Sequence, residues 1–498
     1  MSPKDKAEDI QVEPDQEHFP SLTPNNLKDL KRFWIRLNSI LYPTESDPMR
    51  PEDQQLHKSM IDAYELQEFQ LSFWNWIMMD DPDTMVCKFL RARKFEVFES
   101  LKMLINCLRW RIERKVDQII ESDEIGNQLK TGKAFVHGFD KKGCPIFRIT
   151  ASKHISGAQA PEIVEDFVIY SIESIRLFMI PPNESATILV DLGGFGTSNM
   201  DWKCTSFMTN CLEAYYPETL HCSVINRAPW IFTGIWKVIQ SMLDPVVKEK
   251  VIFSKNEQDL QRMISKSNLL KSESGDSDFE WSYSKPSSSS STLTTSTETS
   301  TEVPKEDQEL LKAKELSTRL KLIEIFNALN HAWLKVQQTR INNANSNVDS
   351  KDKDQEDNAK NDKSDDELAR LVKARALLKL ILRAHYFKLL PLIKSSNVYY
   401  RHKNLSHQEP GIVKFYLKNS KKVLSDDEKV LNNKEEGKGA NEEQEVKGGN
   451  IVVLGQKSCR KSLLARITEE LENLKKTKGE TGDDPIYSLI NQIEIDSL

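Results

Sequence analysis

The chain of 498 residues is long enough for two or three domains, and 38% hydrophobic residues can supply a core of ordinary size. Its formal net charge of -6 is small for this length, which argues against a protein that binds nucleic acid over a large surface. Seven cysteines occur without a Cys-X-X-Cys pair, so we expect neither a disulfide framework nor a metal site, and no motif indicates a cofactor.

The sequence gives no sign of a segment that inserts into a membrane. Its first residues lack the apolar stretch of a secretory signal, and no run of 18 apolar residues occurs along the chain. We therefore expect a cytoplasmic protein whose association with internal membranes is transient and peripheral.

The N-terminal part predicts a helical lobe behind an acidic, disordered stretch. Apolar residues recur at spacings of three and four, as on one face of an amphipathic helix. Asp81 and Pro82 supply an N-cap and a first-turn proline for one of these helices. The helical signals cover Asn25–Leu41, Pro51–Met78, Thr84–Arg93 and Val97–Ile112.

From Ala134 onward, short strands alternate with helices. This order predicts an α/β domain, and its sheet could form the floor of a cavity. The turn over 139–144 between the first two strands indicates a hairpin, and the run Ala186–Asp191 is typical of a strand covered on both faces. We expect strands at 134–136, 145–149, 186–191 and 222–225, and helices at 161–180 and 202–213.

The last third of the chain is mostly polar. Residues 284–302 are rich in Ser and Thr and predict a linker that cannot pack. Helical signals follow at 308–338 and 366–394, separated by an Asn-, Asp- and Lys-rich stretch, and 425–449 is again highly charged. We expect helices joined by disordered linkers, without assigned chemistry.

The segment Trp230–Leu243 carries apolar residues on nearly every side of the helix that it predicts. Such a helix is either buried all round or faces something apolar that is not protein, and it is too short to span a bilayer. Asp244 and Pro245 then begin a further helix, which brings Lys248 and Lys250 close behind the apolar segment.

Several motifs occur in one order along this chain. They are the FLRARKF run at 89–95, Tyr-Pro-Glu at 216–218, Asn-Arg-Ala-Pro-Trp at 226–230 and Leu-Asp-Pro at 243–245. With these motifs, residues 25–283 resemble the CRAL-TRIO lipid-binding superfamily, and the nearest branch is that of the fungal phosphatidylinositol transfer proteins. Members of the family often close the domain with a Gly-Gly pair, whereas this chain has Gly275 alone.

The resemblance implies an α/β CRAL-TRIO domain with a mixed sheet, an apolar cavity and a gate helix, preceded by an all-helical lobe. A partly disordered helical extension would follow. We therefore expect a disordered N-terminus over 1–24, a helical lobe over 25–128, the lipid-binding domain over 129–283, a linker over 284–304 and the extension over 305–498.

The family's head-group site implies roles for three residues here. Matched by motif, the Arg of the basic run, the Glu of Tyr-Pro-Glu and the Lys behind Leu-Asp-Pro are Arg93, Glu218 and Lys250. Cations suit the phosphate oxygens of phosphatidylinositol, and a carboxylate accepts hydrogen bonds from the inositol hydroxyls. A Thr that often precedes the lysine by three positions is Val247 here, which predicts the loss of one hydroxyl contact.

The family's phosphatidylcholine site, by contrast, is not kept. Its strand hydroxyls match Ala186 and Ile188, and a helix tyrosine matches Ile172. Choline phosphate would lose about 1 to 3 kcal/mol for each hydrogen bond left unmade in a dry cavity. We expect weak or no phosphatidylcholine binding, and a second ligand that is a hydrophobic lipid such as a sterol or an isoprenoid.

The gate helix of the resemblance falls on the apolar segment, where the candidate residues for the gate and for membrane contact are Trp230, Phe232, Ile235, Trp236 and Ile239. Indole side chains favour the membrane interface, although the two tryptophans would be equally ordinary in a protein core.

Two functions are compatible with these features. The first is a cytosolic protein that exchanges phosphatidylinositol between membranes. The second is a lipid-sensing scaffold or regulator of a lipid-modifying enzyme, in which the C-terminal helices bind a protein partner. We expect no enzyme activity, because neither G-x-S-x-G nor H-E-x-x-H occurs.

Overall fold

The computed structural model describes residues 22–44, 49–179, 183–285, 305–346, 356–394, 397–402, 405–409, 412–416, 451–454 and 467. The chain divides into two compact units, each built from segments far apart in the sequence. The first unit takes up residues 1–105, 309–389 and 458–498, and the second takes up 106–308 and 390–457. Of the N-terminus expected to be disordered over 1–24, residues 1–21 lie outside the described part of the chain, as does the charged segment 425–449, and Pro24 already begins a helix.

The first unit is helical, as expected. The helical signal over Pro51–Met78 corresponds to two helices, because residues 62–65 form a turn and the second helix begins with a capping box between Glu65 and Glu68. Its helices are α1 Pro24–Leu41, α2 Pro51–Ile61, α3 Leu66–Ile77, α4 Pro82–Ala92, and most of α5 Val97–Glu113, α12 Lys305–Ser346 and α13 Glu356–Ile393.

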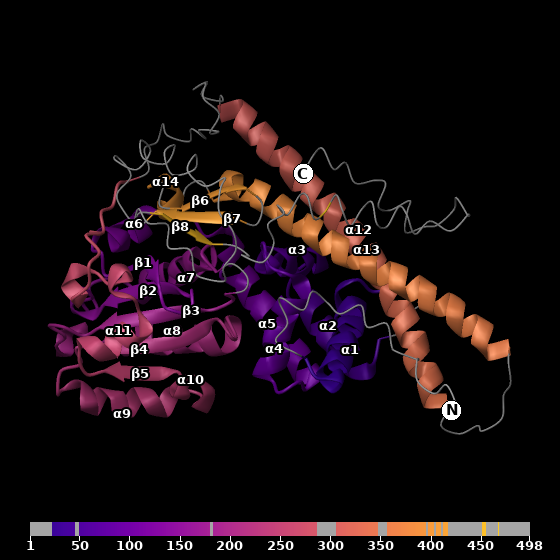
Figure 1. The fold of residues 1–498 in the computed structure, drawn as a ribbon, viewed down its shortest axis with the longest axis horizontal. Helices are drawn as coiled ribbons and strands as arrows, with labels where there is room; N and C mark the ends of the chain where they lie inside the picture. The colour runs from indigo at the N-terminus through magenta and orange to yellow at the C-terminus, as the bar shows by residue number, and fades with distance from the viewer. Residues whose placement is uncertain are drawn as a thin grey trace, which may run out of the picture. The chain divides into compact units, whose positions relative to one another are not determined.

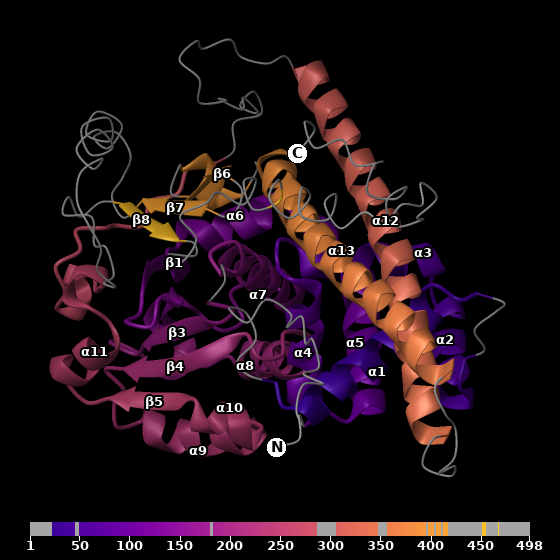
Figure 2. The same ribbon diagram turned by 45° about the vertical axis from the view of Figure 1, so that its right-hand side comes forward.

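Helices α12 and α13 run side by side and complete the core of this unit (Figures 1 and 2). The ring of Phe326 in α12 packs edge-on against Trp34 and Trp74, with centroids 6.4 and 5.3 Å apart. Both helices are longer than their sequence signals and extend into the polar stretch 342–364 from either side. The C-terminal helices are therefore structural parts of the unit that begins at the N-terminus.

A buried charge cluster joins α13 to the start of α4. Arg375 donates from both terminal nitrogens to the carboxylate of Asp83, and Lys379 donates to the same carboxylate at 2.9 Å and pairs with Asp81 at 2.8 Å. Burial raises the pKa of Asp83, but the charges of Arg375 and Lys379 outweigh it and hold this pKa well below its usual value. The ionised carboxylate therefore stabilises the folded unit.

We expect Asp83→Asn to lower the free energy of unfolding by about 3 to 5 kcal/mol at pH 7, because Arg375 would stay buried without its anion and Lys379 would keep only Asp81. The native pKa of Asp83 is depressed, so its contribution is complete above the unfolded value of about 4 and falls as the pH drops further. Urea unfolding at pH 7 and pH 3 measures both effects.

The control for this experiment is Asp29→Asn, which removes an exposed i,i+3 pair with Arg32. It should change the free energy of unfolding by less than about 0.5 kcal/mol. A loss of equal size in both variants, or a cost of Asp83→Asn that grows toward pH 3, would contradict the assignment.

The described residues of the second unit contain a mixed five-stranded sheet in the order β1-β2-β3-β4-β5. Strand β1 is antiparallel to β2, which confirms the expected hairpin, and β2 to β5 are parallel. The strands are β1 Ala134–Phe139, β2 Pro145–Thr150, β3 Ala186–Asp191, β4 Leu220–Asn226 and β5 Val251–Ser254.

Helices precede, connect and follow these strands. The expected helix over 161–180 ends at Arg176, and the one over 202–213 gives way at Cys211 to a π-helical turn, Cys211–Tyr215. The apolar helix starts two residues later than expected, so Trp230 precedes it. The helices are α6 Asp123–Lys130, α7 Pro161–Arg176, α8 Trp202–Asn210, α9 Phe232–Met242, α10 Pro245–Glu249 and α11 Glu257–Met263.

One face of the sheet is closed by protein. Ile146, Leu189 and Val224 point to this face and pack against α11 and the loop that follows it, in a cluster with Leu260 and Leu269. Gly275 fixes that loop, because a Cβ at this position would lie 2.0 Å from the carbonyl oxygen of Leu269. Gly275 therefore has a steric role in the region where members of the family often have a Gly-Gly pair.

We expect Gly275→Ala to lower the free energy of unfolding by about 2 kcal/mol or more, because backbone must move to admit the methyl group. Gly234→Ala in α9 is the matched control: its Cβ would meet no atom within 4 Å, and alanine favours a helix by about 1 kcal/mol. Thermal unfolding should show opposite shifts, and equal melting temperatures for wild type and Gly275→Ala would refute the steric role.

The C-terminal segments of the second unit include strands that the sequence did not predict. The short helix α14 Val398–Arg401 leads to β6 Leu405–Glu409, which pairs antiparallel with β7 Ile412–Tyr416, and β7 pairs antiparallel with β8 Ile451–Leu454. Val136 of β1 donates its N–H to the hydroxyl of Tyr399 at 2.6 Å, and Arg401 pairs with Glu121 at 2.7 Å. This segment is thereby fixed to the α/β unit.

Across the described parts of the chain, no helix has the length and the apolar character needed to cross a membrane.

Candidate functional site

An apolar cavity of about 300 Å³ lies against the other face of the sheet in the second unit. Side chains alternate along a strand, so every second residue of β3 points into the cavity: Ala186, Ile188 and Val190. Neighbouring strands contribute in the same way, with Phe147 and Ile149 from β2, Ser223 and Ile225 from β4, and Val251 from β5.

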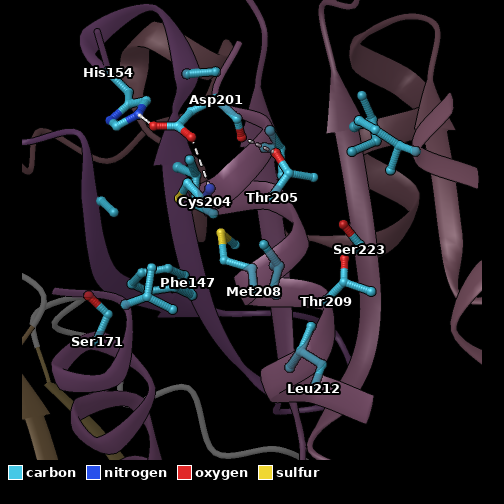
Figure 3. Close-up of a pocket in the computed structure, with 18 of the residues that line it drawn as sticks. Phe147, His154, Ser171, Asp201, Cys204, Thr205, Met208, Thr209, Leu212 and Ser223 are labelled. Atoms are coloured by element: carbon cyan, nitrogen blue, oxygen red, sulfur yellow. Dashed lines mark hydrogen bonds and ion pairs between the residues drawn. The ribbon is translucent and has the colours of Figure 1, made fainter. Parts of the chain in front are cut away.

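Two helices line the cavity with stripes of helical spacing. From α7 the lining residues are Val164, Phe167, Val168, Ser171, Ile172 and Ile175. From the start of α8 onward they are Asp201, Cys204, Thr205, Met208, Thr209 and Leu212 (Figure 3). None of the α8 residues is fully buried, because this stripe faces an open space instead of packed side chains.

Helix α9 covers the cavity as a lid. Phe232, Trp236 and Ile239, together with Leu243, form an i, i+4, i+7, i+11 stripe that lines it. The first three of these residues also pack, together with Ile235, in a cluster with Leu192, Phe195 and Ile225, but Ile235 does not line the cavity. The helix is not buried all round, so one face lies on the cavity and another is exposed.

The outer side of this region carries large exposed apolar residues. Trp230, just before α9, is 87% exposed, Val238 on α9 is 47% exposed, and Val246 on α10 is 52% exposed. Ile252 and Phe253 on the adjoining β5 are also exposed. Figure 1 shows α9 and α10 beside β5, so these residues occupy one region of the unit. The lid region thus presents apolar side chains both to the cavity and to the outside.

Two of the three residues matched to the family's head-group site, Glu218 and Lys250, lie close together. The ammonium of Lys250 is 3.9 Å from a carboxylate oxygen of Glu218 and donates to the carbonyl of Leu220 at 2.9 Å. Both side chains are partly exposed, and their neighbours Thr219, Leu220, Val247 and Val251 line the cavity. The pair therefore stands beside the cavity as a polar site with both signs of charge.

The backbone of Glu218 is held in an uncommon conformation, with φ of 56°. The preceding turn is anchored below it: Tyr215 stacks on Trp110 with ring centroids 4.0 Å apart, and the thiol of Cys107 donates to the Tyr215 carbonyl at 3.2 Å. The hydroxyl of Tyr216 donates to Glu173 at 2.8 Å. These contacts fix where the Glu218 carboxylate can point.

Glu173 itself is fully buried between arginines. It accepts from Arg111 at 2.9 Å and from Arg176 at 3.1 Å. Burial raises the pKa of Glu173, but the two guanidinium charges outweigh burial and hold it well below its usual range. Burial and the Glu173 charge both raise the pKa of Tyr216, which keeps its hydroxyl protonated as a donor.

Arg93, the third predicted head-group ligand, belongs to the first unit. It follows the last residue of α4, its side chain is exposed, and its guanidinium donates to the carbonyl of Ala92 at 3.1 Å. Its role as a phosphate ligand stays a prediction.

The positions matched to the family's phosphatidylcholine site do line the cavity. Ala186, Ile188 and Ile172 all face it without hydroxyl groups, and Val247 faces it where the family often has Thr. Other hydroxyls are present that sequence comparison did not single out. Those of Thr209 and Ser223 point toward one another across the cavity (Figure 3).

A second polar group of lining residues was also missed by sequence reasoning. The Lys133 ammonium contacts Nδ1 of His154 at 3.1 Å, and Nε2 of His154 lies 3.2 Å from the Asp201 carboxylate. Burial lowers the pKa of His154 and the charge of Lys133 lowers it further, which favours a neutral ring. These residues are distant in sequence and belong to no motif, so only the fold reveals them.

Three possible metal ligands also come together: atoms of Asp140, His221 and Cys222 lie within 4.8 Å of one another. Asp140, however, already accepts hydrogen bonds from the backbone of Lys142 and Cys144 in its turn and from the hydroxyl of Thr187 at 2.7 Å. This explains its position, and we assign no metal to the group.

Comparison with known protein families identifies two regions. The model of the CRAL/TRIO domain matches residues 129–275, and the model of the CRAL/TRIO, N-terminal domain matches residues 52–106. The cavity and all of its lining residues fall within the first of these regions.

Curated relatives include fungal proteins. A CRAL-TRIO domain-containing protein of Schizosaccharomyces pombe is 35% identical over 49% of this chain and 58% of the relative. The phosphatidylinositol transfer protein CSR1 of Eremothecium gossypii is 40% identical over 39% of this chain and 47% of the relative. The Sec14 cytosolic factor of S. pombe is 27% identical over 34% of this chain and 65% of the relative. The chain thus spans about half the length of the first two relatives.

Proposed function

Because residues 52–106 and 129–275 belong to the CRAL/TRIO family, we propose that this chain is a lipid-transfer protein that exchanges phosphatidylinositol between membranes. The observation that carries the proposal is the apolar cavity beneath α9 with the Glu218–Lys250 pair beside it. The relative named as a phosphatidylinositol transfer protein supports the choice of lipid.

An enclosed apolar space is what lipid transfer requires physically. Two acyl chains of about 30 methylene groups, at about 0.8 kcal/mol each, need on the order of 25 kcal/mol of apolar burial once outside a bilayer. An open surface patch cannot supply this. A cavity with a helix as its lid can, provided that the lid opens to admit the lipid.

Helix α9 is suited to that movement at a membrane surface. Trp230, Val238 and Val246 are exposed on its outer side or next to it, and such residues gain free energy at a membrane interface. We propose that this surface rests transiently on the bilayer while the lid opens. The inner stripe of Phe232, Trp236 and Ile239 would then line the lipid's exit path.

At the polar site, Lys250 would contact the phosphate and Glu218 would accept hydrogen bonds from inositol hydroxyls. The uncommon backbone conformation of Glu218 supports a role beyond packing, because strain of this kind concentrates at functional sites. The proposed transfer involves no chemical step on the lipid.

We expect Glu218→Gln and Lys250→Met each to lower phosphatidylinositol transfer between vesicles at least tenfold, because each removes a charge-assisted hydrogen bond. Lys248→Met is the matched control: Lys248 is an exposed lysine on α10, and its loss should leave transfer within about twofold. Equal transfer by all three variants and the wild type would exclude the proposed head-group site. Wild-type protein that binds phosphatidylinositol but does not move it would favour the lipid-sensing scaffold.

The same cavity should discriminate against phosphatidylcholine. We expect Ala186→Ser/Ile188→Thr to raise phosphatidylcholine loading about tenfold over the wild type, because two hydroxyls return to the cavity floor. Ala186→Ser/Ile188→Val is the matched control, since Val differs from Thr mainly by a methyl group in place of the hydroxyl. Mass spectrometry of lipids bound after incubation with mixed vesicles gives the ratio, and strong phosphatidylcholine loading of the wild type would contradict the prediction.

A further inference from the structure

We infer that Lys133, His154 and Asp201 form a second polar site in the cavity, which binds the hydroxyl group of a neutral lipid alcohol such as an isoprenoid alcohol. The inference rests on the proposed function in one respect, that the cavity holds lipids. It names the chemical class of the second ligand and the residues that recognise it.

The fold places this site and the Glu218–Lys250 pair at opposite ends of the sheet. Glu218 and Lys250 precede the parallel strands β4 and β5, so they lie at the amino ends of the strands. His154 follows β2 and Asp201 follows β3, and both therefore lie toward the carboxyl ends. Strand β4 has seven residues, which corresponds to about 20 Å between the two ends.

Lys133 lies at the same end of the sheet, because it precedes β1 and β1 is antiparallel to β2. It stands just before β1, and its carbonyl accepts from the N–H of Thr150, the last residue of β2. The Lys133 side chain is buried and lines the cavity. Segments separated by almost 70 positions in the sequence, from Lys133 to Asp201, thus converge on one place in an otherwise apolar wall.

Lys133 can still donate to a ligand. Its ammonium has three N–H groups, and within the described residues two of them have acceptors, Oε1 of Gln128 and Nδ1 of His154. Because Nδ1 accepts from Lys133, the His154 ring carries its proton on Nε2, which donates to Asp201. The ammonium also lies 5.3 Å from the centroid of the Phe167 ring, but this cation–π contact supplies no oxygen acceptor, so the third N–H can donate to a ligand oxygen in the cavity that Phe167 also lines.

Asp201 can still accept. One of its oxygens accepts from His154 and the other accepts from the N–H of Cys204 at 2.9 Å as the N-cap of α8. The backbone N–H of Lys203 also donates to this carboxylate. A carboxylate has room for about four hydrogen bonds. Figure 3 shows His154, Asp201 and Cys204 grouped at one side of the cavity. Donor and acceptor capacity are therefore both present beside an apolar space.

The balance of charge selects the ligand class. One cation and one anion, linked by a neutral imidazole, leave the group without net charge, so a lipid carboxylate or phosphate would meet Asp201 as well as Lys133. A hydroxyl accepts one hydrogen bond and donates another, which matches the capacity that remains. A pure hydrocarbon would leave the remaining donor and acceptor capacity of this group unused and should bind less well.

The experiment compares three C20 probes on the full chain: geranylgeraniol, the hydrocarbon that lacks its hydroxyl, and geranylgeranoic acid. We expect the wild type to bind the alcohol at least tenfold more tightly than either of the other two. Lys133→Met and Asp201→Asn should each bring the ratio of alcohol to hydrocarbon affinity close to one, through weaker alcohol binding alone. Asn retains the N-cap acceptor, so Asp201→Asn should keep α8 intact.

Lys153→Met is the matched control, because Lys153 is an exposed lysine close by whose ammonium contacts the carbonyl of Gly132 at 3.4 Å. It should leave the ratio unchanged. Equal affinity of the wild type for alcohol and hydrocarbon, tighter binding of the acid, or an unchanged ratio in both site variants would each overturn the inference.

Phosphatidylinositol loading, measured on the same samples, separates this inference from the proposed function. Loading without a preference for the alcohol would overturn the inference alone. A preference for the alcohol without phosphatidylinositol loading would support the inference and refute phosphatidylinositol transfer. Binding of neither lipid would overturn both.

Discussion

The architecture of the second unit depends on its five-stranded sheet. Helices cover both faces of this sheet, but side chains pack tightly against only one of them, and the other face borders the cavity. Leu189 and Val224 meet close-packed side chains around α11, while their neighbours Ile188 and Ser223 face a space that the helices surround without filling. A strand with apolar residues at successive positions needs apolar partners on both sides. On the cavity side, the described residues surround the space without filling it, and under the proposed function a lipid would supply the apolar partner.

Rigid parts of the unit hold the polar groups that a lipid would meet. The Glu173 carboxylate, buried between two arginines, positions the tyrosine turn that ends in Glu218. Burying so many charges carries a desolvation cost that a purely structural core would avoid. Its benefit is a fixed carboxylate beside a cavity that is covered by α9, a helix with one exposed side. Under the proposed function, this carboxylate would serve as the recognition site and α9 as the part that moves.

Local signals in the sequence explain which features could be predicted. Prolines at first helical positions and the continuous apolar run of β3 define Pro161, Pro245 and Ala186–Asp191 as element boundaries, and the structure confirms them. The grouping of Lys133 with Asp201 depends on strand order, which no local pattern contains. The packing of Phe326 against Trp34 joins segments almost 300 positions apart, and neither helix carries a signal for the other. Strand β6 is polar, and β7 and β8 are apolar runs of only five and four residues within a highly charged part of the chain, so composition favoured helices and linkers there.

The contact of Tyr399 with β1 has a consequence for how the protein behaves in solution. Strand β1 is the last strand on its side of the sheet, so its outward backbone groups could pair with a strand of another molecule. The phenol hydroxyl occupies the N–H of Val136, and the ring packs against Phe178 and Trp281. A residue 263 positions away in the sequence thus occupies a backbone donor on the outer side of this edge strand, which leaves one site fewer for a strand of another molecule.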